Sequence, residues 1–275
     1  MIQEYFEKVD DAFGNIMVDP KWKTFMCNGI KMLGVNKLVQ SYIPEFDAKG
    51  VSMAMAKGDQ QKALALQDEW ERNKKVSCAL GNCAHLYLEA KMQNKYGRYA
   101  EEIVNEEFPH AEDASAREEV RASFNRIVTQ VDAFRDQIRG RLVPVGSEVV
   151  IGSPKYMVCG IVDQIFWNKK AQEFQIWDWK TNGKFRLNNE KAHFKAPFMH
   201  LDDCEYVKYS MQLAIYKRIF TEETGIPIGQ CYLCWFSSAA PTQQMFPIKD
   251  LSAEVETALS ERAKSLGLVD QGSVF

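Results

Sequence analysis

The sequence predicts an α/β protein of the α+β type, in which a central mixed sheet is flanked by helices and follows a helical N-terminal region. Three observations support this prediction. Apolar residues recur at helical spacing through most of residues 1–140, three strand-like segments with short connections follow Arg141, and a helix, a strand and a last helix come after them. We expect residues 1–75 to form the helical N-terminal region and residues 76–275 to form the core of the same compact unit.

In the first half of the chain, apolar residues recur with the spacing of one helix face. Segments of this kind lie near residues 2–13, 21–40, 51–72 and 76–95. The clearest helix covers residues 113–140, where a Ser/Asp cap region comes first and Gly140 ends the pattern. Residues 101–120 carry eight acidic residues and one Arg, a composition that favours a solvated helix and loop.

In the second half, turn residues separate short strand-like segments. These cover residues 145–151, 156–167 and 173–181, and the connecting turns "GSPK" and "NKKAQ" have hairpin length. A helix at about 203–222, a strand at 228–237 and a helix at about 251–266 follow. This order predicts an antiparallel meander within a mixed sheet, with helices packed on it.

Composition excludes several classes of protein. The chain has 275 residues, of which 46% are hydrophobic and 26% charged, as in ordinary globular proteins. No apolar run reaches the length of a membrane span, and the N-terminus lacks the pattern of a signal peptide. We therefore expect a cytoplasmic protein that does not enter a membrane. The net charge of −3 gives no overall basic signature for nucleic acid.

The seven cysteines form no disulfide pattern. Their number is odd, and only Cys231 and Cys234 form a C-x-x-C, inside a strand-like segment. A zinc or iron–sulfur site would need further cysteines from elsewhere in the fold. We expect these two thiols to be buried or half-buried instead.

The stretch "FQIWDWKTNG", residues 174–183, has the aromatic and β-branched content of a strand and ends at Asn-Gly. Side chains alternate along a strand, so one face should carry Phe174, Ile176, Asp178 and Lys180 and the other Gln175, Trp177 and Trp179. A carboxylate and an ammonium on an otherwise apolar face require an explanation, because burying a charge is costly unless it is paired or bound to metal.

Two further carboxylates belong to the preceding strands of the predicted meander. Asp163 lies among apolar residues of the second strand, and Glu148 lies in the first. Adjacent strands would bring both near Asp178 and Lys180. A carboxylate cluster repels itself and needs a cation, and hard oxygen ligands suit Mg²⁺ or Mn²⁺. The alternative is structural: a salt bridge of Asp178 or Asp163 with Lys180 at a sheet edge.

Together these residues resemble the PD-(D/E)XK nuclease superfamily, and specifically its RecB-like exonuclease branch. "GIVDQI" and, fifteen positions after Asp163, "DWKT" resemble its D…(D/E)-x-K signature. "GNCAH" resembles its upstream Gly-x-x-x-His motif, "SEVV" its preceding Glu, and "MQLAIY" its Q-x-x-x-Y helix. The pieces agree in order and rough spacing over residues 81–216, about half of the chain, and "SYIPEFD" before a helix is similar to phage-encoded members.

The resemblance implies a restriction-endonuclease-like core with a Mg²⁺ or Mn²⁺ ion. It implies that the ion is held by His85, Asp163, Asp178 and the carbonyl of Trp179, with Glu148 acting through a water or at a second, weaker site. Lys180 would orient the attacking water and help to deprotonate it. Gln212 and Tyr216 would contact the scissile region or hold Lys180 and Asp178 in place, and the supporting role is the favoured one. The products would carry a 5′-phosphate and a 3′-hydroxyl. Iron–sulfur members of the branch use a different cysteine arrangement, so we expect no iron–sulfur cluster.

The segment after the D-x-K strand is a candidate DNA-binding surface. Residues 180–218 carry eight Lys and Arg against four acidic residues. Four cations could follow the DNA backbone: Lys184, Arg186, Lys191 and Lys195. His193 and Phe194 could stack on a base, and an exposed loop without this role is the alternative. The helical N-terminal region would form one wall of the site or an arch over the nucleic acid.

Four functions remain open at this point. The first is a metal-dependent DNA exonuclease of recombination or repair, phage-encoded and working with a single-strand annealing protein or a helicase. The second is an endonuclease on the same core. The third is a catalytically silent nuclease fold that binds DNA or assembles with other proteins, against which the presence of Asp163, Asp178 and Lys180 argues. The fourth is a protein without a nucleic-acid function, which the net negative charge supports.

Overall fold

A computed structural model of the protein describes residues 2–19, 24–93, 100–108 and 114–267. A mixed six-stranded sheet lies at its centre, in the order β4-β6-β7-β8-β9, with β5 also paired to β6. The strands are β4 (Leu33–Gly34), β5 (Leu142–Ser153), β6 (Val158–Asn168), β7 (Glu173–Lys180), β8 (Tyr232–Trp235) and β9 (Gln244–Pro247). The β4–β6 and β7–β8 pairs are parallel and the others antiparallel. The predicted meander β5-β6-β7 within a mixed sheet is therefore confirmed.

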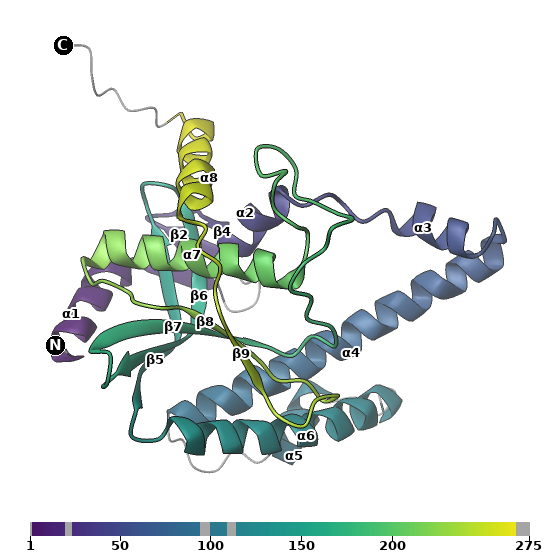
Figure 1. The fold of residues 1–275 in the computed structure, drawn as a ribbon, viewed down its shortest axis with the longest axis horizontal. Helices are drawn as coiled ribbons and strands as arrows, with labels where there is room; N and C mark the ends of the chain where they lie inside the picture. The colour runs from purple at the N-terminus through teal and green to yellow at the C-terminus, as the bar shows by residue number, and fades with distance from the viewer. Residues whose placement is uncertain (1, 20–23, 94–99, 109–113, 268–275) are drawn as a thin grey trace.

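Helices cover both faces of this sheet (Figure 1). One face carries α1 (Ile2–Phe13), α2 (Val35–Ser41), α7 (Glu205–Thr224) and α8 (Ser252–Ser265), and the other carries α4 (Gln60–Met92), α5 (Ala100–Glu107) and α6 (Ala114–Ile138). Each side encloses its own apolar core. These layers confirm the predicted fold class. No helix within the described ranges is both long and apolar enough to cross a membrane.

Strand β7 separates the two cores, as its alternating sequence predicts. Phe174 and Ile176 are buried in the core beneath α7. Trp177 and Trp179 are buried in the opposite core, where their rings lie 5.7 and 5.8 Å from that of Phe134 in α6. With both faces apolar, any charged group on β7 must be paired or lie where the sheet opens.

The predicted helix at 21–40 is wrong over residues 24–34 and is confirmed only at its end, where α2 begins at Val35. The chain instead forms β1 (Ile16–Asp19), β2 (Thr24–Cys27) and β3 (Ile30–Lys31) as a separate three-stranded sheet, followed by β4 and α2. The reason is the dipeptide Asn28-Gly29, whose φ angles of 50° and 77° form the two-residue turn between β2 and β3. This hairpin signal outweighs the helical spacing, and β4 then joins the edge of β6.

The predicted helices at 51–72 and 76–95 are divided differently in the structure. Helix α3 (Ala48–Met55) ends before Gly58, which has a φ of 86°, and Asp59 caps the start of α4. Helix α4 is then continuous to Met92, about 50 Å at 1.5 Å per residue. The predicted division between residues 75 and 76 falls inside this helix, and the division into two regions stays a prediction. Residues 94 and 95 lie outside the described ranges.

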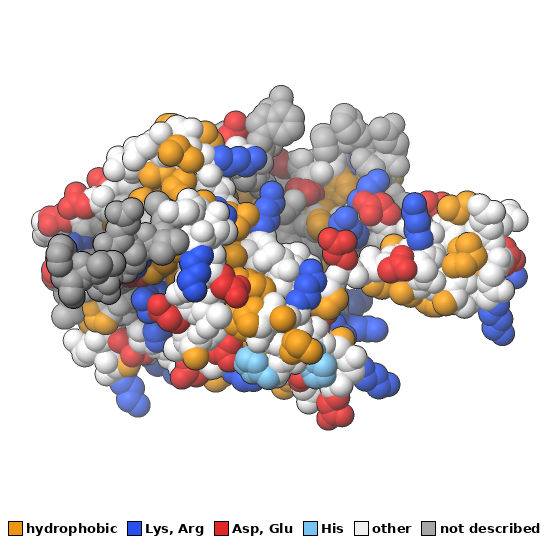
Figure 2. All heavy atoms as spheres, turned by 90° about the horizontal axis from the view of Figure 1, so that it is seen from above, with side chains coloured by type: hydrophobic (Ala, Val, Ile, Leu, Met, Phe, Trp, Pro, Cys, Tyr) orange, Lys and Arg blue, Asp and Glu red, His pale blue; other side chains and the backbone are white. Residues whose placement is uncertain are grey.

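Helix α3 and the N-terminal half of α4 form an arm that projects from the body (Figure 1). Gln67 donates to the hydroxyl of Ser52 at 2.8 Å, and the rings of Phe46 and Trp70 lie 5.6 Å apart, so the arm is held by its own contacts. Figure 2 shows the arm at the right, where hydrophobic side chains lie among charged ones.

Helix α5 and strand β9 are two smaller elements of the fold. The acidic block begins as α5, where Glu101 and Glu102 are exposed and Ile103 and Val104 are buried, so a solvated helix is confirmed for this part. Strand β9 was not predicted, because its residues Gln244–Pro247 include no β-branched side chain and end in Pro.

Candidate active site

Three carboxylates lie in one row across β5, β6 and β7. In the antiparallel register of β5 and β6, Glu148 falls opposite Asp163. In the antiparallel register of β6 and β7, the pair nearest the cleft is Gln164 with Trp177. One residue further along each strand, Asp163 and Asp178 fall opposite each other. The structure thus brings together the side chains that the sequence placed on neighbouring strands.

A cleft opens where β6 has no strand neighbour on one edge. Strand β4 pairs with β6 at Val158 and Cys159, and β7 pairs with it only from Gln164 onward, so residues 160–163 are left between them. The cleft has a volume of about 580 Å³. Six predicted site residues line it: His85, Asp163, Asp178, Lys180, Gln212 and Tyr216. We call this group the floor of the cleft.

Asp163 is fixed by one oxygen and presents the other to the cleft. Its Oδ2 accepts a hydrogen bond of 2.7 Å from the backbone N–H of Trp179, which replaces the ladder bond lost where β6 and β7 diverge. Its Oδ1 lies 3.6 Å from Nδ1 of His85. The carboxylate is therefore oriented before any ligand arrives.

Glu148 reaches the same point by an unusual backbone conformation. Its φ is 52°, in the left-handed region that L-residues other than Gly rarely adopt. Its Oε1 lies 3.9 Å from Nδ1 of His85, and its side chain is 38% exposed. Such a conformation costs about 1–2 kcal/mol, and here it accompanies a carboxylate directed at the site.

His85 connects α4 to the end of β7. Its Nε2 lies 3.1 Å from the carbonyl oxygen of Trp179, the backbone group predicted to bind metal. Gly81 lies one turn earlier on α4. A Cβ atom at Gly81 would lie 3.5 Å from the hydroxyl oxygen of Thr181. Burial lowers the pKa of His85, but the carboxylates of Asp163 and Glu148 outweigh it and raise the pKa to about 9.

These three side chains fit a divalent cation. One ligand atom each from His85, Glu148 and Asp163 lies within 4.8 Å of the others. Carboxylate oxygens are the preferred ligands of Mg²⁺ and Mn²⁺, and imidazole binds first-row transition ions when it is neutral. Asp178, also predicted as a ligand, lies in the same cleft but outside this group of three.

Asp178 instead contacts Lys180. The ammonium lies 2.5 Å from Oδ2 of Asp178, and the two side chains are 16% and 4% exposed. Burial raises the pKa of Asp178, against the attraction of Lys180. Burial also opposes the charge on Lys180, but Asp178 and Asp163 outweigh it and raise the pKa of that amine, so it is an ammonium at neutral pH. The salt bridge between Asp178 and Lys180, which the sequence analysis gave as the structural alternative, therefore lies within the same cleft as the other predicted site residues.

Helix α7 contributes polar side chains to the floor. Gln212 donates to the hydroxyl of Tyr216 at 3.2 Å, and both are buried. A Cβ on Gly160 would lie 2.5 Å from that hydroxyl, so only glycine admits the Tyr216 ring at this position. Tyr209, which the sequence analysis missed, places its ring centroid 4.4 Å from the ammonium of Lys180. Its spacing of three residues before Gln212 on one helix face could have indicated it.

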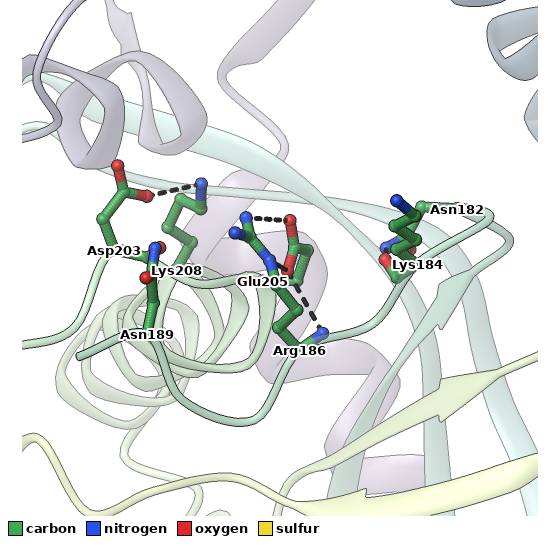
Figure 3. Close-up of polar contacts among 7 residues, drawn as sticks. All are labelled: Asn182, Lys184, Arg186, Asn189, Asp203, Glu205 and Lys208. Carbon is green, nitrogen blue, oxygen red and sulfur yellow. Dashed lines mark hydrogen bonds and ion pairs between the residues drawn. The ribbon is translucent and has the colours of Figure 1, made fainter. Parts of the chain in front are cut away.

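In the loop after β7, some of the cations predicted to bind DNA instead contact other residues of the protein (Figure 3). Arg186 makes a two-pronged contact with Glu205, at 2.8 Å from both Nε and Nη2. Lys195 donates to the carbonyl of Ser41 at 3.2 Å. Lys184 and Lys191 are exposed, and none of the four cations lines the cleft.

The aromatic part of the loop prediction needs correction. Phe194 is 3% exposed and belongs to the core beneath α7, so its ring is not available to stack on a base. His193 is exposed, with its Nδ1 3.5 Å from a carboxylate oxygen of Asp202. The loop packs on α2 because Phe198 lies in edge contact with Tyr42, at 4.8 Å between ring centroids.

The C-x-x-C cysteines lie in two different places. Cys231 is buried in the core beneath α7, and Cys234 is buried in the opposite core. Burial raises the pKa of Cys231 to about 12 and raises that of Cys234 as well. The prediction that these thiols are buried is confirmed, and the sheet separates the two.

The row of carboxylates, the histidine and the buried lysine define a site suited to metal-assisted hydrolysis. The sequence matches the family model of the PD-(D/E)XK nuclease superfamily over residues 61–267, most of the chain. The chain therefore belongs to the PD-(D/E)XK nuclease superfamily, whose members are metal-dependent nucleases.

Comparison with other proteins adds little to this assignment. No curated protein matches the chain. Among solved structures, it is similar to the one titled "Crystal structure of SSO0001", at 13% sequence identity over 73% of this chain and 86% of that one, with a TM-score of 0.27.

Proposed function

We propose that the protein is a Mg²⁺- or Mn²⁺-dependent DNA exonuclease of the RecB-like branch. The observation that carries the proposal is the arrangement of two groups of side chains. The Asp178–Lys180 pair lies in the same cleft as His85 and Asp163, and Glu148 lines a neighbouring pocket to which His85 also belongs. The histidine on α4 and the Gln212–Tyr216 pair on α7 favour the RecB-like branch, because the sequence motifs of that branch correspond to these side chains. Recombination or repair in the cytoplasm, or in a host cell if a phage encodes the protein, is the proposed setting.

The proposed roles follow from where each side chain is held. His85, Glu148, Asp163, Asp178 and the carbonyl of Trp179 would hold the cation. When bound, it would offset negative charge on the phosphate and make a nearby water more acidic. The Oδ2 contact of Asp163 with β7 keeps the carboxylate in place, so little reorientation is needed.

Lys180 has a more specific role than the sequence alone implies. As an ammonium it donates hydrogen bonds, so it can orient the attacking water and stabilise charge on the phosphate. It would have to lose its proton before it could accept one from the water. Asp178 and the ring of Tyr209 fix its position. Gln212 and Tyr216 keep a supporting role, since both are buried and bonded to each other.

The test is degradation of end-labelled linear DNA with Mg²⁺ or Mn²⁺, with a covalently closed circle as the substrate control. Wild type is compared with Asp163→Ala and Lys180→Ala, and with Lys170→Ala in the exposed turn between β6 and β7 as the matched variant. We expect metal-dependent loss of linear DNA by wild type and Lys170→Ala only. If the wild type also cuts the circle, the protein is an endonuclease and not an exonuclease. If a folded wild type cuts neither substrate with either metal, the proposal is refuted.

A further inference from the structure

The floor of the cleft has no unpaired lysine that could bind the phosphates on either side of the scissile phosphate. Its one lysine, Lys180, is paired with Asp178. The loop after β7 does not line the cleft, and Arg186 there is paired with Glu205. A nuclease must also bind phosphates beside the scissile one, because phosphate contacts supply most of the affinity for nucleic acid and set its register.

The opposite side of the cleft has the charge that this task requires. It consists of Thr24, Phe25 and residues 31–37, which we call the N-terminal wall. Lys31, at the end of β3, and Lys37, on α2, are both exposed and border the cleft. Neither has a carboxylate within ion-pair distance in the described part of the chain, and no residue of the wall is acidic.

A third cation extends this positive side. Arg262 of α8 also lines the cleft, and its guanidinium donates to the carbonyl oxygens of Tyr156 and Met157, at 3.3 and 3.5 Å. Carbonyl groups hold a guanidinium in place without neutralising it. The described lining therefore has its only carboxylates, Asp163 and Asp178, on the floor, while the charges away from the floor are positive.

The wall is held in position by the sheet and by the loop. Strand β4 pairs with Val158 and Cys159 of β6, which places the wall directly beside the floor. At the far end of α2, the backbone N–H of Lys195 donates to the carbonyl of Tyr42 at 2.7 Å. A basic surface on a fixed support can bind phosphates without ordering a flexible segment first.

We propose that Lys31 and Lys37 bind backbone phosphates of the nucleic-acid strand whose scissile phosphate lies on the floor. The ligand class is a polyanionic phosphodiester chain, and the inference rests on the proposed nuclease function. The wall carries the binding role that the sequence suggested for Lys184 and Lys191, and those two lysines contribute little.

The test compares two double variants that lose the same charge. Lys31→Ala/Lys37→Ala removes the wall lysines, and Lys184→Ala/Lys191→Ala removes two exposed lysines of the loop. Binding of a labelled DNA duplex is measured by fluorescence anisotropy in EDTA over a range of NaCl concentrations, so that cleavage does not interfere. Each phosphate contact contributes about 0.9 to the slope of log K against log salt for duplex DNA.

We expect the wall variant to bind the duplex at least about tenfold more weakly than wild type. The slope of log K against log salt should decrease in magnitude by about 1.8. The loop variant should stay within about twofold of wild type, with a slope unchanged. In metal, the wall variant should raise KM and leave kcat close to wild type. Lys31→Arg/Lys37→Arg, which keeps both charges, should restore the slope, and this separates phosphate binding from an effect on folding.

Equal weakening by the two double variants would overturn the inference, since total charge alone would then explain it. So would a wall variant that binds like wild type. These outcomes are independent of the proposed function, which wild-type cleavage tests separately. Salt-dependent binding that is lost in the wall variant, with no cleavage by wild type, would support the wall and refute the nuclease. A wild type that binds no DNA at low salt would overturn both.

Discussion

The end of β7, which lies on the floor of the cleft, and the loop after β7 are adjacent in sequence, yet they use charge in opposite ways. On the floor, the side chains of Asp178 and Lys180 are only 4% and 16% exposed next to Asp163, and the whole group faces one cleft. In the loop, Arg186 is half exposed, and its partner Glu205 at the start of α7 is partly buried, with a side chain 19% exposed. Both segments carry conspicuous charges, but only one directs them at the site.

The difference shows which charges in a sequence carry information. A charge within an apolar strand has a high desolvation cost, so it persists only with a partner or a ligand. A charge in a loop has little such cost, and any nearby opposite charge can pair with it. We therefore expect variants of the floor to have large effects on cleavage or stability and variants of the loop to have small ones.

The largest effect should come from Asp163→Asn. The amide can still accept the hydrogen bond from the Trp179 N–H, so the fold should persist, but the charge that would attract a cation is gone. We expect the rate of metal-dependent DNA cleavage to fall by about 10³-fold. The loop variant Lys184→Ala/Lys191→Ala should cleave within about threefold of wild type. A loop variant as inactive as Asp163→Asn would erase the contrast between the two regions.

The second effect concerns the stability of the floor. Lys180→Met leaves the carboxylate of Asp178 buried without its partner, which should lower the free energy of unfolding by about 3 kcal/mol. Adding Asp178→Asn removes the unpaired charge and should recover most of this loss. The measurement is urea unfolding of the wild type, both single variants and the double variant in EDTA. Single effects that simply add would show that the pair is not coupled.

The third effect separates function from stability at Glu148. Glycine adopts a φ of 52° without strain, so Glu148→Gly should be more stable than Glu148→Ala by about 1 kcal/mol. Both variants lose the carboxylate and should lose cleavage equally. Urea unfolding and the linear-DNA assay on the two variants test this together. Equal stability would mean that the backbone at Glu148 relaxes when its side chain is shortened.

Much of the floor could be predicted because its strand carboxylates break a local pattern and its other members belong to recognisable motifs. Asp163 and Asp178 interrupt apolar strands, and the register of two hairpins then fixes them side by side. The order of the flanking motifs identified His85 and the Gln212–Tyr216 pair. The conformation of Glu148 was not predictable, because a left-handed residue within a strand has no composition signal of its own.

The rest of the cleft could not be predicted, since it depends on contacts between distant segments. The sequence predicts one helix over residues 21–40, which is correct for Lys37 on α2 but not for Lys31, and only the pairing of β4 with β6 places both lysines at the cleft. Likewise, Arg186 and Glu205 are far apart in sequence, and the helix start that brings them together decides how that arginine is used. Exposed lysines look alike in a sequence whatever they face.

The smallest effect should come from Arg186→Ala, and it depends on pH. Partial burial opposes ionisation of Glu205, but the hydrogen bonds from Arg186 outweigh it and lower the pKa of that carboxyl group. A lowered pKa in the folded state means that the pair stabilises the fold above the unfolded value of about 4.3 and that this contribution is lost as the pH falls through the folded pKa. Removing the guanidinium should therefore lower the free energy of unfolding at pH 7 by about 0.5–1 kcal/mol, a difference that disappears in acid.

Urea unfolding of wild type and Arg186→Ala at pH 7 and in steps below pH 4.3 measures this difference, and Glu205→Gln should reproduce it without adding to it. Cleavage of linear DNA by Arg186→Ala should stay within about twofold of wild type, because Glu205 already occupies the guanidinium. A loss of cleavage far larger than the loss of stability would mean that Arg186 leaves Glu205 to bind the DNA. The loop would then belong to the site, and burial would no longer be what distinguishes the two regions.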